Sequence, residues 1–163
     1  MKNKSTLFLT QAAVTAAIYV VLTVVFAPFS FGEIQVRLAE VLTILPFFTP
    51  TAIPGLFVGC LLGNILGGAV IWDTIFGSIA TLIGAVGTCL LRKKSLYLAP
   101  LPPIISNMVI VPFVLKYAYA VPLPIPLMML TVGVGEVISC GVLGVIFGKI
   151  LQKHESAIFK GKY

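Results

Sequence analysis

The hydrophobic pattern of this chain consists of long apolar runs separated by breaks that contain polar residues, glycine or proline. A helix that crosses the hydrocarbon core of a membrane needs about 20 predominantly apolar residues. The runs approach this length repeatedly, so the pattern predicts an all-α membrane protein, a bundle of six transmembrane helices. The predicted helices cover residues 7–27, 34–48, 53–68, 73–91, 103–119 and 126–151.

The second and third segments are short and close together, so they could instead merge into one crossing and give five helices. The basic residues favour six, because short cytoplasmic loops are enriched in Lys and Arg. With six helices and a cytoplasmic N-terminus, nine of the 11 basic residues lie on the inner side, and only Arg37 and Lys116 lie in the outer half. We therefore predict that both termini are cytoplasmic. The nine inner residues are Lys2, Lys4, Arg92, Lys93, Lys94, Lys149, Lys153, Lys160 and Lys162.

The composition indicates that lipid is the solvent for most of the surface. Of the 163 residues, 59% are hydrophobic and 10% are charged, and the mean hydropathy is +1.11. A soluble domain carries about 25% charged residues. The length predicts a single integral membrane domain, residues 1–163, in a multi-pass protein of the cell membrane. Because the net charge of +6 is concentrated at the predicted inner face, it does not indicate a nucleic-acid partner.

Patterns for catalysis, metal binding and ATP binding are missing from the sequence. His154 lies in the basic tail, so we expect no metal site and no histidine base within the membrane. The three cysteines lie in apolar stretches and are interpreted as small buried hydrophobic residues. The 144–149 run has the wrong glycine spacing for a phosphate loop, and Ile150 stands where a hydroxyl is needed. We therefore expect no enzyme and no cofactor, and any uphill transport would take its energy from a partner or an ion gradient.

Small residues recur at helical spacing on two of the predicted helices. Gly55, Gly59, Gly63 and Gly67 repeat every four residues on the third helix. On the first helix, Ala12 with Ala16 and Ala13 with Ala17 form similar strips. Small residues at this spacing let helix backbones approach closely within a membrane. For the glycines, the interpretation that we favour is packing inside the bundle.

Ionisable residues within the apolar segments are the candidates for function. Four of the five acidic residues, Glu33, Glu40, Asp73 and Glu136, map to the outer half or the membrane interior. An ionisable group there costs several kcal/mol unless it is paired or hydrated, so it indicates a functional site by default. Glu136 lies about 15 Å of helical rise into the last segment.

Structural interpretations of the same residues stay open. Glu33, Arg37 and Glu40 share one helical face and could form an ion-pair triad that anchors the second helix. Trp72 beside Asp73 could be an interfacial aromatic residue next to a helix N-cap. Glu136 could serve only an internal hydrogen bond, for example with Asn107 in the fifth helix.

Three motifs together resemble the QueT family, and the resemblance extends over nearly the whole chain. They are the RLAE run and the FFTPTAIPGLFVGC segment, both within residues 35–67, and WDTIFGSIA at residues 72–80. The resemblance implies a substrate-binding subunit of an energy-coupling-factor (ECF) transporter. Such a subunit binds its ligand from outside and associates with a transmembrane coupling protein and two cytoplasmic ATPases. The ligands that the resemblance implies are queuosine precursors, which are 7-deazaguanines.

The resemblance also implies roles for particular residues. Small residues on the first helix dock on the coupling protein, a role that passes to Ala12 and Ala16 or to the adjacent Ala13 and Ala17. The resemblance assigns ligand binding mainly to Glu40, Asp73, Asn107 and Glu136, and in second place to Arg37, Asn64, Trp72 and Tyr119.

The chemistry of a 7-deazaguanine suits these residues. Its ring N–H and exocyclic amine are two parallel donors that one carboxylate can accept, and the base could stack on Trp72. An aminomethyl substituent would add a positive charge that a second carboxylate would attract. Two other readings stay open, namely a subunit for another vitamin and a stand-alone secondary carrier coupled to protons through Glu136. An intramembrane enzyme is disfavoured because no catalytic constellation is found.

Overall fold

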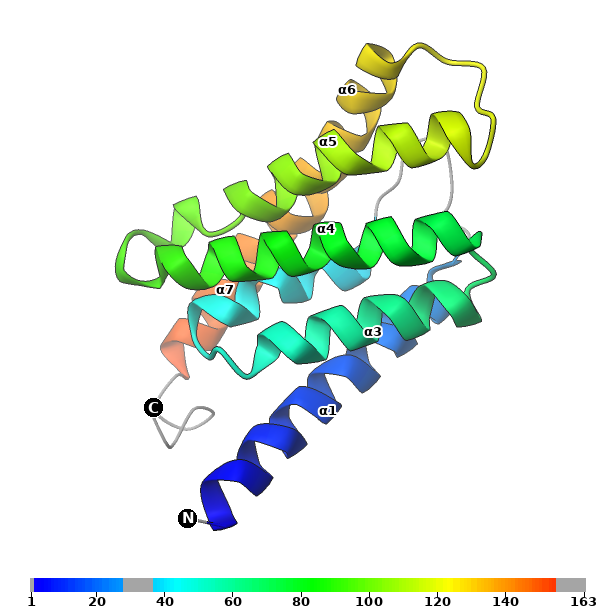
Figure 1. The fold of residues 1–163 in the computed structure, drawn as a ribbon. Coiled ribbons are helices and arrows are strands. Elements are labelled where there is room, and N and C mark those ends of the chain that lie inside the picture. Colours follow the sequence, from blue (N-terminus) through cyan, green and yellow to red (C-terminus); the bar gives the residue numbers. More distant parts are fainter. Residues whose placement is uncertain (1, 28–36, 155–163) are drawn as a thin grey trace.

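The computed structural model describes residues 2–27 and 37–154, and nearly all of these residues are helical (Figure 1). The 34–48 prediction begins in residues outside this range, and Glu33 also lies outside it. In chain order the elements are α1 (Lys2–Val25), η1 (Leu38–Phe47), α3 (Ala52–Leu66), α4 (Ile71–Leu90), η2 (Leu91–Lys93), η3 (Leu96–Leu98), α5 (Leu101–Tyr117), α6 (Ile125–Glu136), η4 (Val137–Leu143) and α7 (Gly144–Lys153).

Four continuous helical stretches of the described residues are long and apolar enough to cross a membrane. They are Lys4–Val25, Ile71–Lys93, Leu96–Tyr117 and Ile125–Lys153. The all-helical membrane class is thus confirmed. The remaining two predicted spans are shorter, because η1 has 10 residues and α3 has 15 residues. The count of six crossings stays a prediction.

Two elements depart from α-helical geometry beside the predicted site residues. The whole of η1 is a 3-10 helix of 10 residues, which rises about 20 Å where an α-helix would rise about 15 Å. In the last long helix, the seven residues of η4 form a π-helix between α6 and α7. Long 3-10 runs and π-helical turns are uncommon and often mark functional positions. Glu40 lies in η1, and Glu136 is the residue immediately before η4.

The successive helices alternate in direction. Figure 1 places the start of α1, the connection between α4 and α5, and the end of α7 at the same end of the bundle. At this end the Lys149 ammonium lies 5.1 Å from the centre of the Tyr97 ring, which ties α7 to η3. The predicted basic loop and the start of the predicted basic tail therefore share one face. That this face is cytoplasmic stays a prediction.

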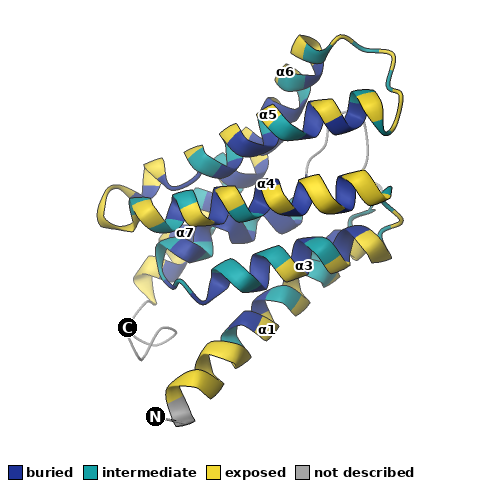
Figure 2. Ribbon diagram, viewed as in Figure 1, coloured by how far each residue is buried: buried dark blue, intermediate teal, exposed yellow. Residues whose placement is uncertain are grey.

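The distribution of polarity is the inverse of that in a soluble protein. Leu9, Leu66, Leu90 and Leu130 are at least 64% exposed. In contrast, Arg37, Glu40, Asp73, Glu136, Asn64 and Asn107 are all at most 5% exposed. Figure 2 shows exposed residues along the outer sides of α1 and α4 and buried residues facing the other helices. This arrangement fits an apolar solvent outside the bundle and a polar site within it.

The glycine face of α3 packs directly against α1, as the interpretation of internal packing predicted. A Cβ on Gly55 would lie 2.5 Å from the Ala12 carbonyl oxygen, and a Cβ on Gly59 would lie 3.0 Å from the Ala16 Cα. Only glycine allows such close approach. Ala12 and Ala16 thus face the inside of the bundle, whereas Ala13 and Ala17 are exposed.

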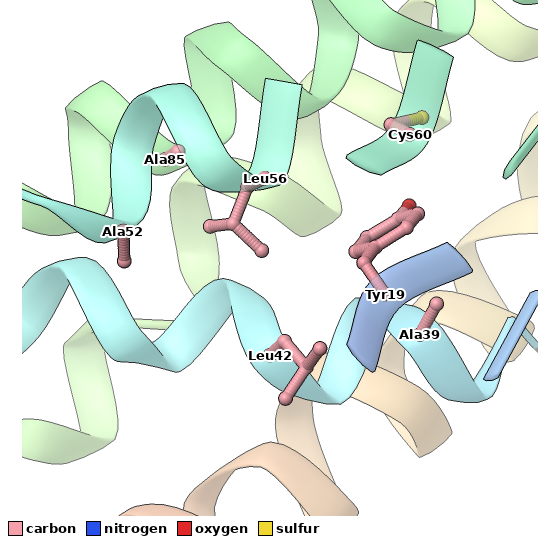
Figure 3. Close-up of a cluster of buried hydrophobic side chains, with 7 residues drawn as sticks. All are labelled: Tyr19, Ala39, Leu42, Ala52, Leu56, Cys60 and Ala85. Carbon is pink, nitrogen blue, oxygen red and sulfur yellow. The ribbon is translucent and has the colours of Figure 1, made fainter. Parts of the chain in front are cut away.

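A buried apolar cluster lies beside the polar site and positions it. Figure 3 shows this cluster, in which Tyr19 of α1 meets Leu42 of η1 and Leu56 and Cys60 of α3. The ring of Tyr19 is 1% exposed, so close packing fixes its hydroxyl group. Ala39, Ala52 and Ala85 complete the cluster with small side chains, which allow η1 and α4 to approach α1 and α3.

Candidate functional site

Two carboxylates meet at the centre of the bundle. Glu40 of η1 is 0% exposed, and Glu136 at the end of α6 is 3% exposed. One carboxylate oxygen of each, together with the Sγ of Cys140, lie within 4.8 Å of one another. Residues almost a hundred positions apart in the sequence therefore form one acidic centre, where η1 packs against the junction of α6 and η4.

Glu40 is held by donors from two other helices. The Tyr19 hydroxyl of α1 donates to Glu40 Oε1, and the Thr81 hydroxyl of α4 donates to the same oxygen over 3.2 Å. Among the described residues, Glu40 Oε2 has no hydrogen-bond partner although it is buried. An unsatisfied buried carboxylate oxygen is costly, and it leaves one strong acceptor in the centre of the site.

Glu136 is held by an amide and a thiol. The Asn107 Nδ2 of α5 donates to Glu136 Oε1 over 3.0 Å, and the Cys140 thiol donates to Glu136 Oε2 over 3.1 Å. The bond to Asn107 is the contact that the structural interpretation of Glu136 requires. The same bond also orients the carboxylate towards Glu40, so it is compatible with a binding role.

A second polar cluster surrounds Asp73 at the start of α4. Arg37 forms an ion pair with Asp73 over 3.4 Å, and the Tyr119 hydroxyl donates to Asp73 Oδ2 over 3.0 Å. Asn64 Nδ2 lies 3.4 Å from the Asp73 carbonyl oxygen. Burial and the neighbouring Asp73 carboxylate raise the pKa of Tyr119 above its ordinary value, so its hydroxyl stays a donor at neutral pH.

The two clusters are connected through α3. Asn64 Nδ2 lies 3.7 Å from Cys60 Sγ, and the Thr81 hydroxyl lies 3.4 Å from the same sulfur while it donates to Glu40. Gly77 makes room for this connection, since a Cβ there would lie 3.2 Å from both Asn64 Nδ2 and Asp73 Oδ1. The structure therefore brings together seven of the eight predicted binding residues.

Trp72 is the predicted binding residue that lies apart from this network. Its side chain is 56% exposed and stacks on Phe76, with ring centroids 6.0 Å apart. Both rings line an apolar groove of about 450 Å³ that Phe113 and Tyr117 of α5 also line. The position is typical of an interfacial aromatic residue. A second apolar groove, of about 370 Å³, lies between α5 and the last long helix.

Sequence reasoning missed several residues of the acidic centre. Tyr19 and Thr81 lie in mostly apolar helices with no motif that marks them, and the sequence indicates only a small hydrophobic residue at Cys140. Thr43 of η1 lies 3.4 Å from Cys140 Sγ, and the buried Ser139 Oγ has no hydrogen-bond partner among the described residues. Helical spacing gave one signal, since Glu136 and Cys140 are four residues apart.

The arrangement of donors at the acidic centre leaves one carboxylate oxygen free to accept from a ligand. Tyr19, Thr81, Asn107 and Cys140 each direct a hydrogen towards the carboxylates. Both hydrogens on Glu40 go to Oε1, so among the described residues the lone pairs of Oε2 stay free and can accept an N–H or O–H donor of a ligand.

The fold and this site define a multi-pass helical membrane protein with a buried cluster of acidic side chains, and such a protein fits the class of membrane transporters. Residues 9–153 match the model of the family described as QueT transporter. The chain belongs to this family.

One curated relative and the search of solved structures add to this finding. The chain is 35% identical, over 86 residues, to a protein of Lactococcus lactis subsp. cremoris (strain MG1363) named "Queuosine precursor transporter QueT". The match covers 51% of this chain and 50% of the relative, so it spans about half the length of the curated relative. No solved structure matches the chain significantly.

Proposed function

We infer that this chain is the substrate-binding membrane subunit of an ATP-driven ECF-type importer, which captures a queuosine precursor from outside the cell. Family membership supports the transporter class, and the name of the Lactococcus relative supports a queuosine precursor as the ligand. The ECF type of coupling follows from the family resemblance, which implies a transmembrane coupling subunit and two cytoplasmic ATPase subunits as partners.

The observation that carries this proposal is the pair of buried carboxylates. Glu40 and Glu136 come from different helices and present oxygens within 4.8 Å of each other. A 7-deazaguanine offers a ring N–H and an exocyclic amine, and charge-assisted hydrogen bonds to carboxylates are roughly twice as strong as neutral ones. Asn107 holds Glu136 in place and can also contact a ligand that lies between the two acids.

The Asp73 cluster forms the outer part of the proposed site. Asp73 forms an ion pair with Arg37 and accepts a hydrogen bond from Tyr119, so it orients both groups. Its negative charge cancels the positive charge of Arg37. Asn64 connects the cluster to the acidic centre. Trp72 faces the apolar groove instead of the carboxylates, so a stacking role for it would require a ligand that reaches the groove side of α4.

For the docking strip we propose the pair of alanines that is exposed on α1. Ala12 and Ala16 are occupied by the close contact with α3. Ala13 and Ala17 are exposed on α1 and leave a smooth face that a helix of the coupling subunit could approach closely.

The second candidate function is a stand-alone secondary carrier that couples substrate to protons through Glu136. The carboxylate pair favours this candidate, because buried acids form proton relays in many carriers. Purification in mild detergent separates the two. Co-purifying ATPase subunits support the importer, whereas uptake by the chain alone in liposomes supports the carrier.

The test of the ligand is mass spectrometry of the small molecules that the purified chain retains. We expect a 7-deazaguanine in the wild-type preparation and a reduced amount in a Glu40→Gln preparation. A retained vitamin of another class would overturn the proposed substrate and leave a subunit for that vitamin.

A further inference from the structure

We propose that the Glu40–Glu136 pair binds its ligand through a positively charged amine, and that this ammonium group replaces a proton held by the empty pair. The inference rests on the proposed function and deepens it. It adds the charge of the ligand and the exchange of a proton.

The charges around the pair leave two carboxylates to be matched. Among the described residues, the titratable and charged groups that face the pair are Tyr19 from α1, Cys60 from α3, Arg37 at the start of η1 and Cys140 from η4. The other facing groups, Thr81 of α4 and Asn107 of α5, do not titrate. Arg37 is the one cation among these groups, and its ion pair with Asp73 balances its charge.

Two negative charges this close repel strongly in a site of low dielectric constant, so a buried carboxylate pair does not hold both without a cation. Glu40 is 0% exposed and Glu136 is 3% exposed, so water screens neither. When no ligand is bound, a proton shared by the pair removes one of the two charges. Pairs of this kind titrate as a unit.

The geometry also specifies the chemistry of the replacing group. Each of the four surrounding donors already gives a hydrogen to the pair, and Glu40 Oε2 is the acceptor that has no partner among the described residues. An ammonium group brings three N–H donors and one positive charge. It can donate a hydrogen bond to this oxygen. Its positive charge neutralises the carboxylate that is left when the proton departs.

The exchange balances in atoms and charge. The empty site holds one carboxylic acid and one carboxylate, and the ligand arrives as R–NH₃⁺. The O–H bond of the carboxylic acid breaks, its proton passes to solvent, and the ammonium keeps all its hydrogens between two carboxylates. One proton therefore leaves for each ligand that binds.

The sign of the pH dependence follows from this exchange. Protons compete with the ligand for the pair, so lowering the pH weakens binding, and raising it strengthens binding by at most about tenfold per pH unit. The gain stops where the empty pair no longer holds its proton or where the ligand amine itself loses its charge. A neutral ligand displaces no proton and should bind with little dependence on pH.

The experiment is isothermal titration calorimetry of the purified full chain with two probes that share one ring. One probe is a 7-deazaguanine with an aminomethyl group at C7, and the other carries a neutral nitrile at the same carbon. Titrations in phosphate and in Tris, whose ionisation enthalpies differ, measure the protons released. We expect the cationic probe to bind at least about tenfold more tightly and to release about one proton, and the neutral probe to release none.

Variants make the assignment specific to the pair. In Glu136→Gln and in Glu40→Gln, proton release should vanish and the preference for the cationic probe should shrink. Thr88→Val is the control and should behave as wild type. It removes a buried hydroxyl that bonds to the Ala99 carbonyl oxygen. Either variant that folds suffices. Equal affinity for the two probes, or binding without proton release in the wild type, would overturn the proposal and leave the proposed function standing. Binding of neither probe would overturn both.

Discussion

At the scale of single residues, the effect of changing the carboxylate of Glu136 distinguishes a binding site from a purely structural hydrogen-bond network. Its oxygens accept from Asn107 and Cys140, and they lie close to those of Glu40. A merely structural role would make its charge matter for folding. A binding role would make its charge matter for affinity.

We predict that Glu136→Gln lowers the affinity for a 7-deazaguanine by about tenfold or more, which is about 1.4 kcal/mol. The amide keeps the shape but replaces one acceptor by a donor, which would face the donors of the ligand. The variant should still fold, because a neutral amide is cheaper to bury than a carboxylate. Calorimetric affinity and thermal stability are measured on the same preparation. A loss of stability with unchanged affinity in the surviving protein would identify a structural role.

A second residue-scale prediction concerns the ion pair of Arg37 and Asp73. Removing one partner of a buried pair costs about 3–5 kcal/mol, because the other charge is left without compensation. Asp73→Asn and Arg37→Gln should each lower the melting temperature, although Tyr119 still donates to Asp73 when Arg37 is changed. The double variant should be less destabilised than the sum of the two. Additive effects of the two changes would contradict a direct pairing.

At the scale of elements, the contact between α1 and α3 determines where Tyr19 lies and thereby supports the acidic centre. A Cβ on Gly59 would lie 2.8 Å from the Tyr19 Cβ. The same contact explains why only one of the two alanine strips on α1 is exposed. The irregular helices η1 and η4 meet on the other side of the centre and bring Glu40 and Glu136 face to face.

We predict that Gly59→Ala destabilises the chain by about 1–3 kcal/mol through overpacking and weakens ligand binding by displacing Tyr19. Gly141→Ala is the matched control, because the atoms nearest to its Cβ would be 3.7 and 3.8 Å away. Thermal unfolding in detergent and ligand affinity are measured for both. If Gly59→Ala proves as stable as the control, the close approach of α1 and α3 does not determine the position of Tyr19.

At the scale of the whole molecule, the exposed surface is mostly apolar and the basic residues gather at one end. We expect this asymmetry to set the orientation of the chain in the membrane. The charged and amide side chains of the site face the inside of the bundle, so partner binding is expected on its lipid-facing sides.

The orientation can be tested with single cysteines introduced at Lys93 and His154. We predict that an impermeant maleimide labels neither position in intact cells, because short basic segments stay in the cytoplasm. A cysteine at Leu123, in the connection between α5 and α6, should be labelled from outside. The unmodified chain gives the background from its three native cysteines, all of which are free thiols. Labelling at either basic position would favour five crossings.

The docking proposal predicts that Ala13→Trp or Ala17→Trp abolishes uptake and leaves ligand binding by the isolated chain intact. A large side chain would hold the partner helix away from α1. Leu130→Trp is the control, since Leu130 is exposed at 64% on α6. Uptake that survives both alanine changes would place the docking face elsewhere.

The sequence by itself determined the class of protein and most of its helices. The apolar runs and the rarity of charges require a membrane solvent, and both can be counted along the chain. Because charged residues are rare in the apolar segments, the sequence also identifies Glu40, Asp73 and Glu136 as candidate site residues. An acid in an apolar segment is costly whatever the fold. The three sequence motifs also indicate the QueT family without the structure.

Only the tertiary structure decided how these residues are partnered. Sequence spacing groups Arg37 with its neighbours Glu33 and Glu40, of which Glu33 lies outside the described residues, whereas the ion pair with Asp73, 36 positions away, appears only in the structure. The structure also added Tyr19, Thr81 and Cys140 to the acidic centre and turned Trp72 outwards. The physical reason is that helical periodicity specifies which face a residue occupies, whereas its partners depend on which helices pack together, and that depends on close contacts such as those of Gly55 and Gly59 with α1.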